Sequence, residues 1–370
     1  MAIGLYVHIP FCGQKCPYCD FYSAVPAKHT LDIYTDVLER QLYAFSGKNI
    51  SADTLYFGGG TPNLLGGERL SRLIDAAKAG FSLPEDSEIT VEANPSTTTG
   101  AFLDTIRKSG ANRLSLGLQS AEERELRFLG RRHTPEQCTK VIRDARSAGF
   151  SHISLDLMLA VPGQTKDSLH RSIAFCLSQD IEHLSAYLLK IEPGTPFYRQ
   201  KDTLFLPDED ETADLYSQLV TELAEAGYRQ YEISNFAKAG FQGRHNLKYW
   251  HGEEYLGFGP SAHSFHGGKR FYYPRSLDDY LLGKPPIDDG DGGSREEVAM
   301  LQLRLTEGLS DAMWRSRFGE PLPGALLQRA KQYEKAGLIQ FDSPTSFHLT
   351  PDGFLVSNLL IGELLEALGN

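Results

Sequence analysis

The chain has 370 residues, a formal net charge of −11 at pH 7, and 41% hydrophobic against 23% charged residues. It holds no apolar stretch of the roughly 18 to 20 residues that cross a membrane, and no signal peptide opens it. The acidic balance repels phosphate backbones, so a nucleic-acid partner is not expected. We therefore expect a cytoplasmic protein with one large domain and one smaller domain.

Short apolar or β-branched runs alternate with amphipathic segments over the first half of the chain. The expected strands are 5–9, 54–58, 88–94, 112–119, 152–159 and 183–189. The expected helices between them are 30–46, 67–80, 100–109, 135–148 and 166–179. Repeated alternation of this kind predicts a parallel sheet with right-handed crossovers, which is an α/β fold. Because a closed barrel needs eight repeats and only six strands are present, the pattern predicts a partial (β/α)6 barrel.

The second half of the chain predicts a different organisation. Residues 231–240 are consistent with a further strand and turn, whereas 243–265 show neither helical nor strand periodicity and predict a structured loop region. Residues 282–297 concentrate Pro, Gly and Asp and are the best candidate linker. The helices and two short strands that follow predict a winged-helix-like α+β domain. Residues 295–370 hold seven Lys or Arg against ten Asp or Glu, which favours an interaction or lid role over DNA binding.

These observations divide the chain into three parts. Residues 1–235 would form the barrel, 236–290 a connecting region rich in histidine and aromatic residues, and 291–370 the C-terminal domain. The loops that follow the strands of a parallel sheet meet at one mouth, where function is usually found.

Polar residues lie at several of the expected strand ends. Glu92 and Asn94 end the third strand, Gln119 and Ser120 end the fourth, and Asp156 lies in the fifth. Buried polar groups without partners cost on the order of 1–3 kcal/mol each. Several of them at one mouth therefore favour a ligand site.

Three of the five cysteines lie directly after the first expected strand, in the stretch HIPFCGQKCPYCDFYS. These residues are Cys12, Cys16 and Cys19. A structural zinc site would need a fourth ligand, for which only His8 and Asp20 are near, and a redox CxxC pair would leave the third cysteine unexplained. A [4Fe–4S] cluster usually takes four thiolates, so three would leave one iron open to a substrate or cofactor. The spacing favours the iron–sulfur cluster over zinc.

The CxxxCxxC motif, with Tyr18 before its last cysteine, resembles the signature of the radical S-adenosylmethionine (SAM) superfamily. The segment GGGTP, residues 58–62, is similar to the family's glycine-rich loop after the second strand. Glycines there let the backbone approach a ligand closely. The resemblance implies that the amine and carboxylate of SAM bind the open iron. It also implies that an electron from the cluster splits SAM into methionine and a 5′-deoxyadenosyl radical.

A finer resemblance is to the coproporphyrinogen-dehydrogenase branch and, within it, to the HemW-type haem chaperones. It is carried by LYVHIPFC, GGGTPNLL, EANP, LGLQS, DLMLAVPGQT, IEPGTPFY and YEISNFA. The residues that it implies for the first SAM site are Tyr6, Gly59, Gly60, Thr61, Pro62 and Glu92. The residues that match contacts to a second SAM in the dehydrogenases are Tyr18, Gln119, Arg131 and Asp156. Whether a second SAM binds here is left open.

Two features favour the chaperones over the dehydrogenases. The dehydrogenases carry another cysteine two positions after the third, where this chain has Phe21, and an N-terminal extension, whereas this chain begins almost at its first strand. The segment HNLKYW fits the HNxxYW pattern associated with HemW proteins and proposed to bind haem. His245 would be an axial iron ligand, and Tyr249 and Trp250 would offer flat faces to the porphyrin. The alternative for His245 is a packed structural histidine.

The resemblance implies a haem chaperone that binds a [4Fe–4S] cluster, SAM and haem and delivers haem to an acceptor protein. It also implies a small electron-transfer partner, such as a flavodoxin or ferredoxin, and at most a peripheral position at the membrane during haem delivery; a homodimer is left open. Two alternatives remain. One is an oxygen-independent coproporphyrinogen III dehydrogenase, which decarboxylates propionate side chains, and the other is a zinc-bound structural or interaction protein.

Overall fold

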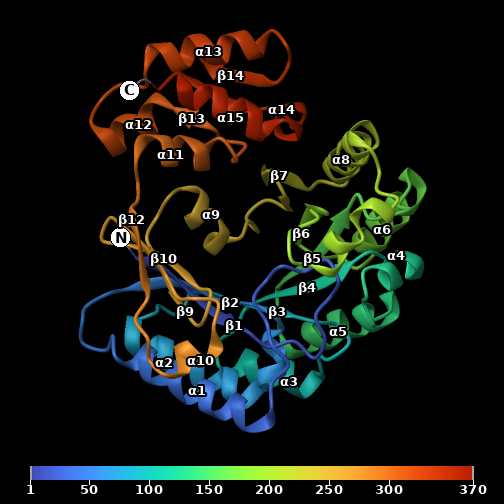
Figure 1. Cartoon of the computed structure of the whole chain (residues 1–370), viewed down its shortest axis with the longest axis vertical. Coiled ribbons are helices and arrows are strands. Elements are labelled where there is room, and N and C mark those ends of the chain that lie inside the picture. The colour runs from blue at the N-terminus through green and yellow to red at the C-terminus, as the bar shows by residue number, and fades with distance from the viewer. Residues whose placement is uncertain (1, 369–370) are drawn as a thin grey trace.

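The computed structural model describes residues 2–368 and shows a curved sheet with helices along its outer side and a separate C-terminal unit (Figure 1). Six neighbouring strands of the sheet run parallel. They are β1 (Ile3–Ile9), β2 (Ala52–Gly59), β3 (Glu88–Ala93), β4 (Arg113–Gln119), β5 (His152–Leu159) and β6 (His183–Leu188). The helices that follow them are α1 (Lys28–Tyr43), α2 (Gly67–Phe81), α3 (Gly100–Lys108), α4 (Glu123–Phe128), α5 (Pro135–Ala148) and α6 (Lys166–Ser178). The partial barrel predicted from the sequence is confirmed.

Each parallel strand has an apolar face toward the helices and a more polar face toward the barrel interior. In β1, Leu5, Val7 and Ile9 are fully buried in the main hydrophobic core, while Tyr6 and His8 alternate with them. Alternation with a period of two sends successive side chains to opposite faces of a sheet. The outer apolar layer therefore holds the fold together, and the inner face is left for polar residues.

Local signals fix where the helices begin and end. In α5 the Thr134 hydroxyl accepts a hydrogen bond from the amide of Gln137, and Pro135 occupies the first turn. Gly149 follows the helix with a φ of 94°, a left-handed conformation that glycine adopts without a steric penalty. The strand and helix positions predicted for the first half of the chain are accordingly close to those observed.

The barrel sheet continues with shorter strands on both edges. Its twelve strands have the order β12-β11-β10-β9-β1-β2-β3-β4-β5-β6-β8-β7. The added elements in chain order are α7 (Pro196–Arg199), α8 (Glu209–Glu225), β7 (Arg229–Glu232), β8 (Asn235–Ala237), α9 (Arg244–Trp250), β9 (Tyr255–Phe258), β10 (His263–His266), β11 (Lys269–Tyr272), α10 (Leu277–Leu281) and β12 (Ile287–Asp291). Two short 3₁₀ helices, η1 (Pro62–Leu65) and η2 (Lys201–Thr203), lie in loops.

Two sequence expectations for this part were wrong. Residues 243–265 form helix α9 and strands β9 and β10 instead of an irregular region, because elements of four to seven residues are too short to show a hydrophobic period. The candidate linker 282–297 contains β12, which pairs antiparallel with β11 at the edge of the sheet. All five residues of β12 are exposed, so its sequence shows no alternation of apolar and polar residues that would predict a strand. The domain limits at 235 and 290 stay a prediction.

The C-terminal unit packs its helices around a three-stranded sheet of order β13-β15-β14. Its elements are α11 (Arg295–Gln302), β13 (Leu309–Ser310), α12 (Asp311–Phe318), α13 (Gly324–Glu334), β14 (Ile339–Ser343), β15 (Ser346–Leu349), α14 (Pro351–Leu355) and α15 (Ser357–Glu366). Trp314 and Phe347 are fully buried in it. The winged-helix-like α+β arrangement is confirmed, with one more strand and one more helix than expected. None of the helices within residues 2–368 has the length and apolar character needed to cross a bilayer.

Candidate functional site

The three clustered cysteines lie in the loop that leaves β1 at the mouth of the barrel. Cys12, Cys16 and Cys19 are partly exposed and carry free thiols. The base of the loop is held by two backbone hydrogen bonds, from the Cys12 amide to the Ala24 carbonyl at 3.1 Å and from the Ala24 amide to the Pro10 carbonyl at 2.8 Å. The loop is thus closed at its base, and its three sulfurs are left without covalent partners.

The donor set of this loop fits an iron–sulfur cluster. Among residues 2–368, no three or more His, Cys, Asp or Glu side chains are grouped as ligands of one metal ion. Each thiolate of a [4Fe–4S] cluster binds a different iron, and three thiols in one loop are a suitable donor set for it. Arg131 Nη1 lies 3.9 Å from Cys16 Sγ, where a guanidinium balances part of the negative charge that thiolates bring.

The glycine-rich loop lies against the start of the cysteine loop. The amides of Gly60 and Thr61 donate to the carbonyls of Ile9 and Phe11 at 2.9 and 2.7 Å. A Cβ atom on Gly60 would lie 2.7 Å from both of these carbonyl oxygens, so a larger residue would force the two loops apart. Thr61 Oγ1 is 3.4 Å from Cys12 Sγ. The structure therefore brings together two loops separated by about 50 residues.

The remaining residues of the glycine-rich loop shape its path. Gly59 has a φ of 105°, which a residue with a side chain adopts only under strain. Its amide donates to Glu92 Oε2 at 3.2 Å. Pro62 begins the 3₁₀ helix η1. The loop thus turns sharply and connects directly to a carboxylate inside the barrel.

Two buried carboxyl groups lie inside the mouth. Glu92 Oε1 accepts a hydrogen bond from the Tyr56 hydroxyl at 2.6 Å, and burial raises the pKa of Glu92. Asp156 Oδ1 accepts from Ser115 Oγ at 3.0 Å. Burial, together with the negative charge of Glu92, raises the pKa of Asp156 to about 7. A cationic ligand between these carboxyls would favour their charged forms.

Gln119 and Arg131 lie at the end of β4 and in the loop before α5. Gln119 has a φ of 70°, an uncommon conformation for a residue other than glycine. Arg131 Nη2 donates to the Gly117 carbonyl at 2.6 Å, while its buried Nε has no hydrogen-bond partner within the described chain. An unsatisfied buried donor of a charged group points to a missing acceptor, and a bound cofactor would supply one.

The two predicted tyrosines of the SAM sites lie on different sides of the mouth. The Tyr6 hydroxyl is 2.9 Å from His8 Nδ1. Tyr18 packs against a small apolar cluster that includes Leu129 and Phe197, and burial raises its pKa. Tyr6 therefore faces the barrel interior, whereas Tyr18 anchors the cysteine loop to the loop after β6.

The HNxxYW motif forms α9, which closes the floor of the barrel at the opposite end from the cysteines. His245 is 2% exposed; its Nδ1 is 2.8 Å from Thr54 Oγ1 and its Nε2 is 2.8 Å from the Tyr249 hydroxyl. Burial lowers its pKa to about 3. Trp250 points elsewhere, with the Arg304 guanidinium 5.9 Å from the centre of its ring. His245 and Tyr249 are thus brought together, and both ring nitrogens of His245 are already bonded.

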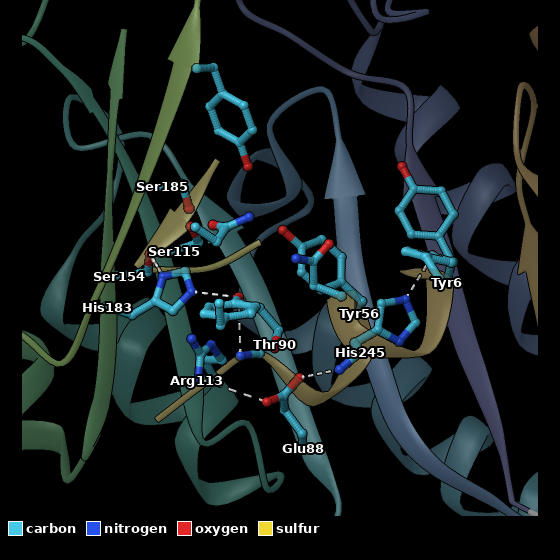
Figure 2. Close-up of a pocket in the computed structure, with 16 residues that line it drawn as sticks. Tyr6, Tyr56, Glu88, Thr90, Arg113, Ser115, Ser154, His183, Ser185 and His245 are labelled. Atoms are coloured by element: carbon cyan, nitrogen blue, oxygen red, sulfur yellow. Dashed lines mark hydrogen bonds and ion pairs between the residues drawn. The ribbon is translucent and has the colours of Figure 1, made fainter. Parts of the chain in front are cut away.

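A cavity of about 200 Å³ occupies the interior between the mouth and α9. Figure 2 shows Tyr6, Tyr56 and His245 on one side, His183, Ser154 and Ser115 on the other, and Arg113 and Glu88 below them. The sequence interpretation missed Glu88, Arg113, Ser154 and His183, which lie at the beginnings of their strands and not at the ends. For Arg113 the signal was present, because β4 reads RLSLGLQ and places a polar residue or glycine at every second position.

Comparison with known proteins agrees with this geometry. The radical SAM superfamily model matches residues 6–176, and the model of the HemN C-terminal domain matches residues 295–356. The chain is 37% identical to the haem chaperone HemW of Bacillus subtilis over 98% of this chain and 99% of that protein. It is 35% identical to HemW of Mycobacterium tuberculosis over 98% of this chain and 94% of that protein.

A solved structure also shares the fold. The coproporphyrinogen III oxidase HemN of Escherichia coli matches with a TM-score of 0.82 and 24% identity, over 99% of this chain and 90% of that chain. At this level of identity the likeness concerns the fold, including the arrangement of barrel and C-terminal unit.

Proposed function

Because the chain belongs to the HemW family of haem chaperones within the radical SAM superfamily, we propose that it binds haem and delivers it to an acceptor protein. We further propose that it holds a [4Fe–4S] cluster on Cys12, Cys16 and Cys19, with SAM at the open iron. The observation that carries the cofactor assignment is the meeting of three free thiols with the glycine-rich loop and Arg131 at one mouth.

When bound, the cluster and SAM supply one-electron chemistry. The chain's own residues hold and orient these groups. Gly59 and Gly60 fit closely against His8 and the start of the cysteine loop, which would bring the backbone of the glycine-rich loop beside the methionine part of SAM, and Glu92 and Asp156 would balance the positive charge of SAM. Arg131 supplies the cationic contact beside Cys16 and keeps a free Nε donor for a cofactor oxygen.

We place haem binding at α9, through His245 and Tyr249. His245 would bind haem iron only if one of its hydrogen bonds, to Thr54 or to Tyr249, were released. A neutral imidazole is the form that binds iron, and the lowered pKa keeps His245 neutral across the physiological range. Trp250 lies outside this group and would contact only an exposed porphyrin edge. A flavodoxin-like or ferredoxin-like electron donor and a cytoplasmic location belong to the same proposal.

Anaerobic reconstitution followed by haem transfer tests this function. Reconstituted protein is expected to contain about four irons with matching sulfide, to bind haem, and to pass it to an apo-haemoprotein. Incubation with coproporphyrinogen III, SAM and a reductant is expected to give no protoporphyrinogen. Stoichiometric zinc without sulfide, or decarboxylation of the porphyrinogen, would contradict the proposal.

Haem titration of His245→Ala tests the ligand assignment. The variant is expected to lose the iron–imidazole absorbance spectrum, and haem affinity is expected to fall. His263→Ala, which removes an exposed histidine on β10, is the matched control and should leave both unchanged. An unaltered spectrum in His245→Ala would remove His245 from the haem site.

A further inference from the structure

The cavity above α9 contains more hydrogen-bond donors than its own acceptors satisfy. Arg113 Nη2, Asn246 Nδ2 and Thr90 Oγ1 all belong to residues that line the cavity, and none of the three atoms has a hydrogen-bond partner in residues 2–368. Arg113 is 5% exposed and Thr90 is 2% exposed. Buried donors are nearly always paired in native proteins, so this group indicates a missing acceptor.

The positive charge of Arg113 is only partly neutralised by its neighbours. Its ion pair with Glu88 is long, with 3.8 Å between Nη1 and Oε2, and Nη1 also donates to the Phe241 carbonyl at 3.0 Å. Both oxygens of Glu88 accept backbone amides of α9, from Arg244 at 3.0 Å and His245 at 2.9 Å. Glu88 therefore mainly accepts hydrogen bonds from the first turn of α9, and Nη2 of Arg113 is free to bind another anion.

Other polar groups around the cavity are satisfied. His183 Nδ1 is 2.7 Å from Ser154 Oγ, and its Nε2 is 2.8 Å from the Tyr231 hydroxyl. The Tyr56 hydroxyl is bonded to Glu92. Tyr56 and Tyr231 also line the cavity, with one face of the Tyr56 ring stacked on His245, while the unpaired groups are concentrated on Arg113, Asn246 and Thr90.

We propose that this cavity binds a small monocarboxylate anion. The carboxylate would accept from Arg113 and Asn246, and the hydrocarbon part would lie against Tyr56 and Tyr231. Tyr187 lines the cavity and is 45% exposed, so the ligand would enter beside it from the mouth. The volume of about 200 Å³ is below the roughly 300–1,000 Å³ of pockets for drug-sized ligands, which favours a free small acid over a porphyrin propionate. His245 and Tyr249 also line this cavity, so the site shares residues with the proposed haem site, but it does not require haem to bind.

Calorimetric titration of the cluster-reconstituted protein with butyrate tests the proposal. Butyramide has the same hydrocarbon chain without the negative charge and is the matched ligand control. Butyrate is expected to bind at least tenfold more tightly than butyramide. Equal binding of the two, or no binding of butyrate, would show that the cavity takes water or apolar groups instead and would overturn the proposal.

Variants separate this site from its surroundings. Arg113→Lys keeps the positive charge but removes Nη2, and it is expected to lower the affinity for butyrate at least tenfold. Asn246→Ala and Thr90→Val should each lower this affinity severalfold. These two variants test the proposal if Arg113→Lys does not fold. Arg244→Lys is the matched control. Arg244 lies on α9, the helix that carries Asn246, but its guanidinium contacts Asp53 and the Asp86 carbonyl outside the cavity. An equal loss in Arg244→Lys would contradict the assignment.

Competition distinguishes a free acid from haem as the source of the carboxylate. Haem and its dimethyl ester, which lacks free carboxylates, are each added to butyrate-loaded protein. If the cavity binds a free small acid, haem should displace butyrate no better than haem dimethyl ester does. Displacement by haem alone would assign the cavity to its propionates and overturn the free-acid proposal.

Discussion

The mouth and the floor of the barrel are built on the same strands but satisfy their polar groups in different ways. At the mouth, Cys12 Sγ lies 3.4 Å from Thr61 Oγ1 and Cys16 Sγ lies 3.9 Å from Arg131 Nη1, which are weak contacts. At the floor, both ring nitrogens of His245 have partners at 2.8 Å. Groups left without strong partners are ready for an incoming cofactor, whereas bonded groups hold the structure. Substitution of the cysteines at the mouth should therefore remove the cluster, and substitution of a bonded anchor at the floor, such as Glu88, should lower stability.

Cys16→Ala is expected to give the largest effect on function. The loss of one of three thiolate ligands should abolish the cluster, with iron falling from about four per chain to near zero. The free energy of unfolding of the metal-free protein should change by less than about 0.5 kcal/mol, because Cys16 is partly exposed and outside the core. Iron and sulfide assays with denaturant unfolding measure both quantities.

Cys176→Ala is the matched control for this comparison. Cys176 is fully buried, so its removal should cost about 1 kcal/mol of stability and leave the cluster intact. A full cluster in Cys16→Ala would show that Cys16 is not a cluster ligand. A lost cluster in Cys176→Ala would show that the core cysteine is needed for the cluster.

Glu88→Gln should show the opposite behaviour at the floor. The substitution leaves Arg113 without its ion pair. It also replaces the carboxylate that accepts hydrogen bonds from two backbone amides of α9 with a neutral amide. Breaking a buried ion pair from one side typically costs about 3–5 kcal/mol; since glutamine keeps one acceptor oxygen and the pair is long, we expect about 2–4 kcal/mol. Cluster content should be unchanged.

Denaturant unfolding of Glu88→Gln beside Glu254→Gln checks this prediction. Glu254 is a partly exposed carboxylate that pairs with His266, and its substitution should cost less than about 1 kcal/mol. Equal losses in the two variants would mean that α9 does not depend on its buried anchor.

The same contrast explains how much was predictable from the sequence. The parallel strands and five of the helices that follow them were predicted within two residues at most ends, because long amphipathic segments and caps such as Thr134 carry strong local signals; the six-residue helix α4 was not predicted. The cysteine site was predicted from spacing alone. The pairing of Arg113 with Glu88 could not be predicted, since only the register of β3 and β4 brings them together. Helix α9 was missed because seven residues form barely two turns.

Asp156 predicts a moderate dependence of stability on pH. Its pKa of about 7 in the folded protein lies above the usual 3.8, so the folded state holds a proton that the unfolded state has lost. Stability should therefore fall as pH rises from about 4 to 7 and then level off, by roughly 2 kcal/mol after allowance for partial access of water. Asp156→Asn should flatten this part of the profile in the cofactor-free protein.

Chemical unfolding across this pH range tests the assignment to the mouth. Ser185→Ala removes a neighbouring hydroxyl that lowers the same pKa, so it should extend the fall in stability to higher pH and increase its total size. A profile in Asp156→Asn identical to that of the wild type would show that Asp156 titrates normally and is not held between Ser115 and Glu92.

We expect the smallest effect on stability from substitution of His251, which lies where α9 meets the C-terminal unit. Its Nε2 is 2.6 Å from Glu307 Oε1, and hydrogen bonds to Glu253 and Glu307 raise its pKa to about 9. The raised pKa means that this stabilisation is fully present below about pH 6.5 and is lost as pH rises through 9. His251→Gln should therefore lower the free energy of unfolding by less than about 1 kcal/mol at pH 6 and have no effect at pH 10. Glu307→Gln should show the same pH window, whereas a loss that persists at pH 10 would show that His251 acts by packing and not by its charge.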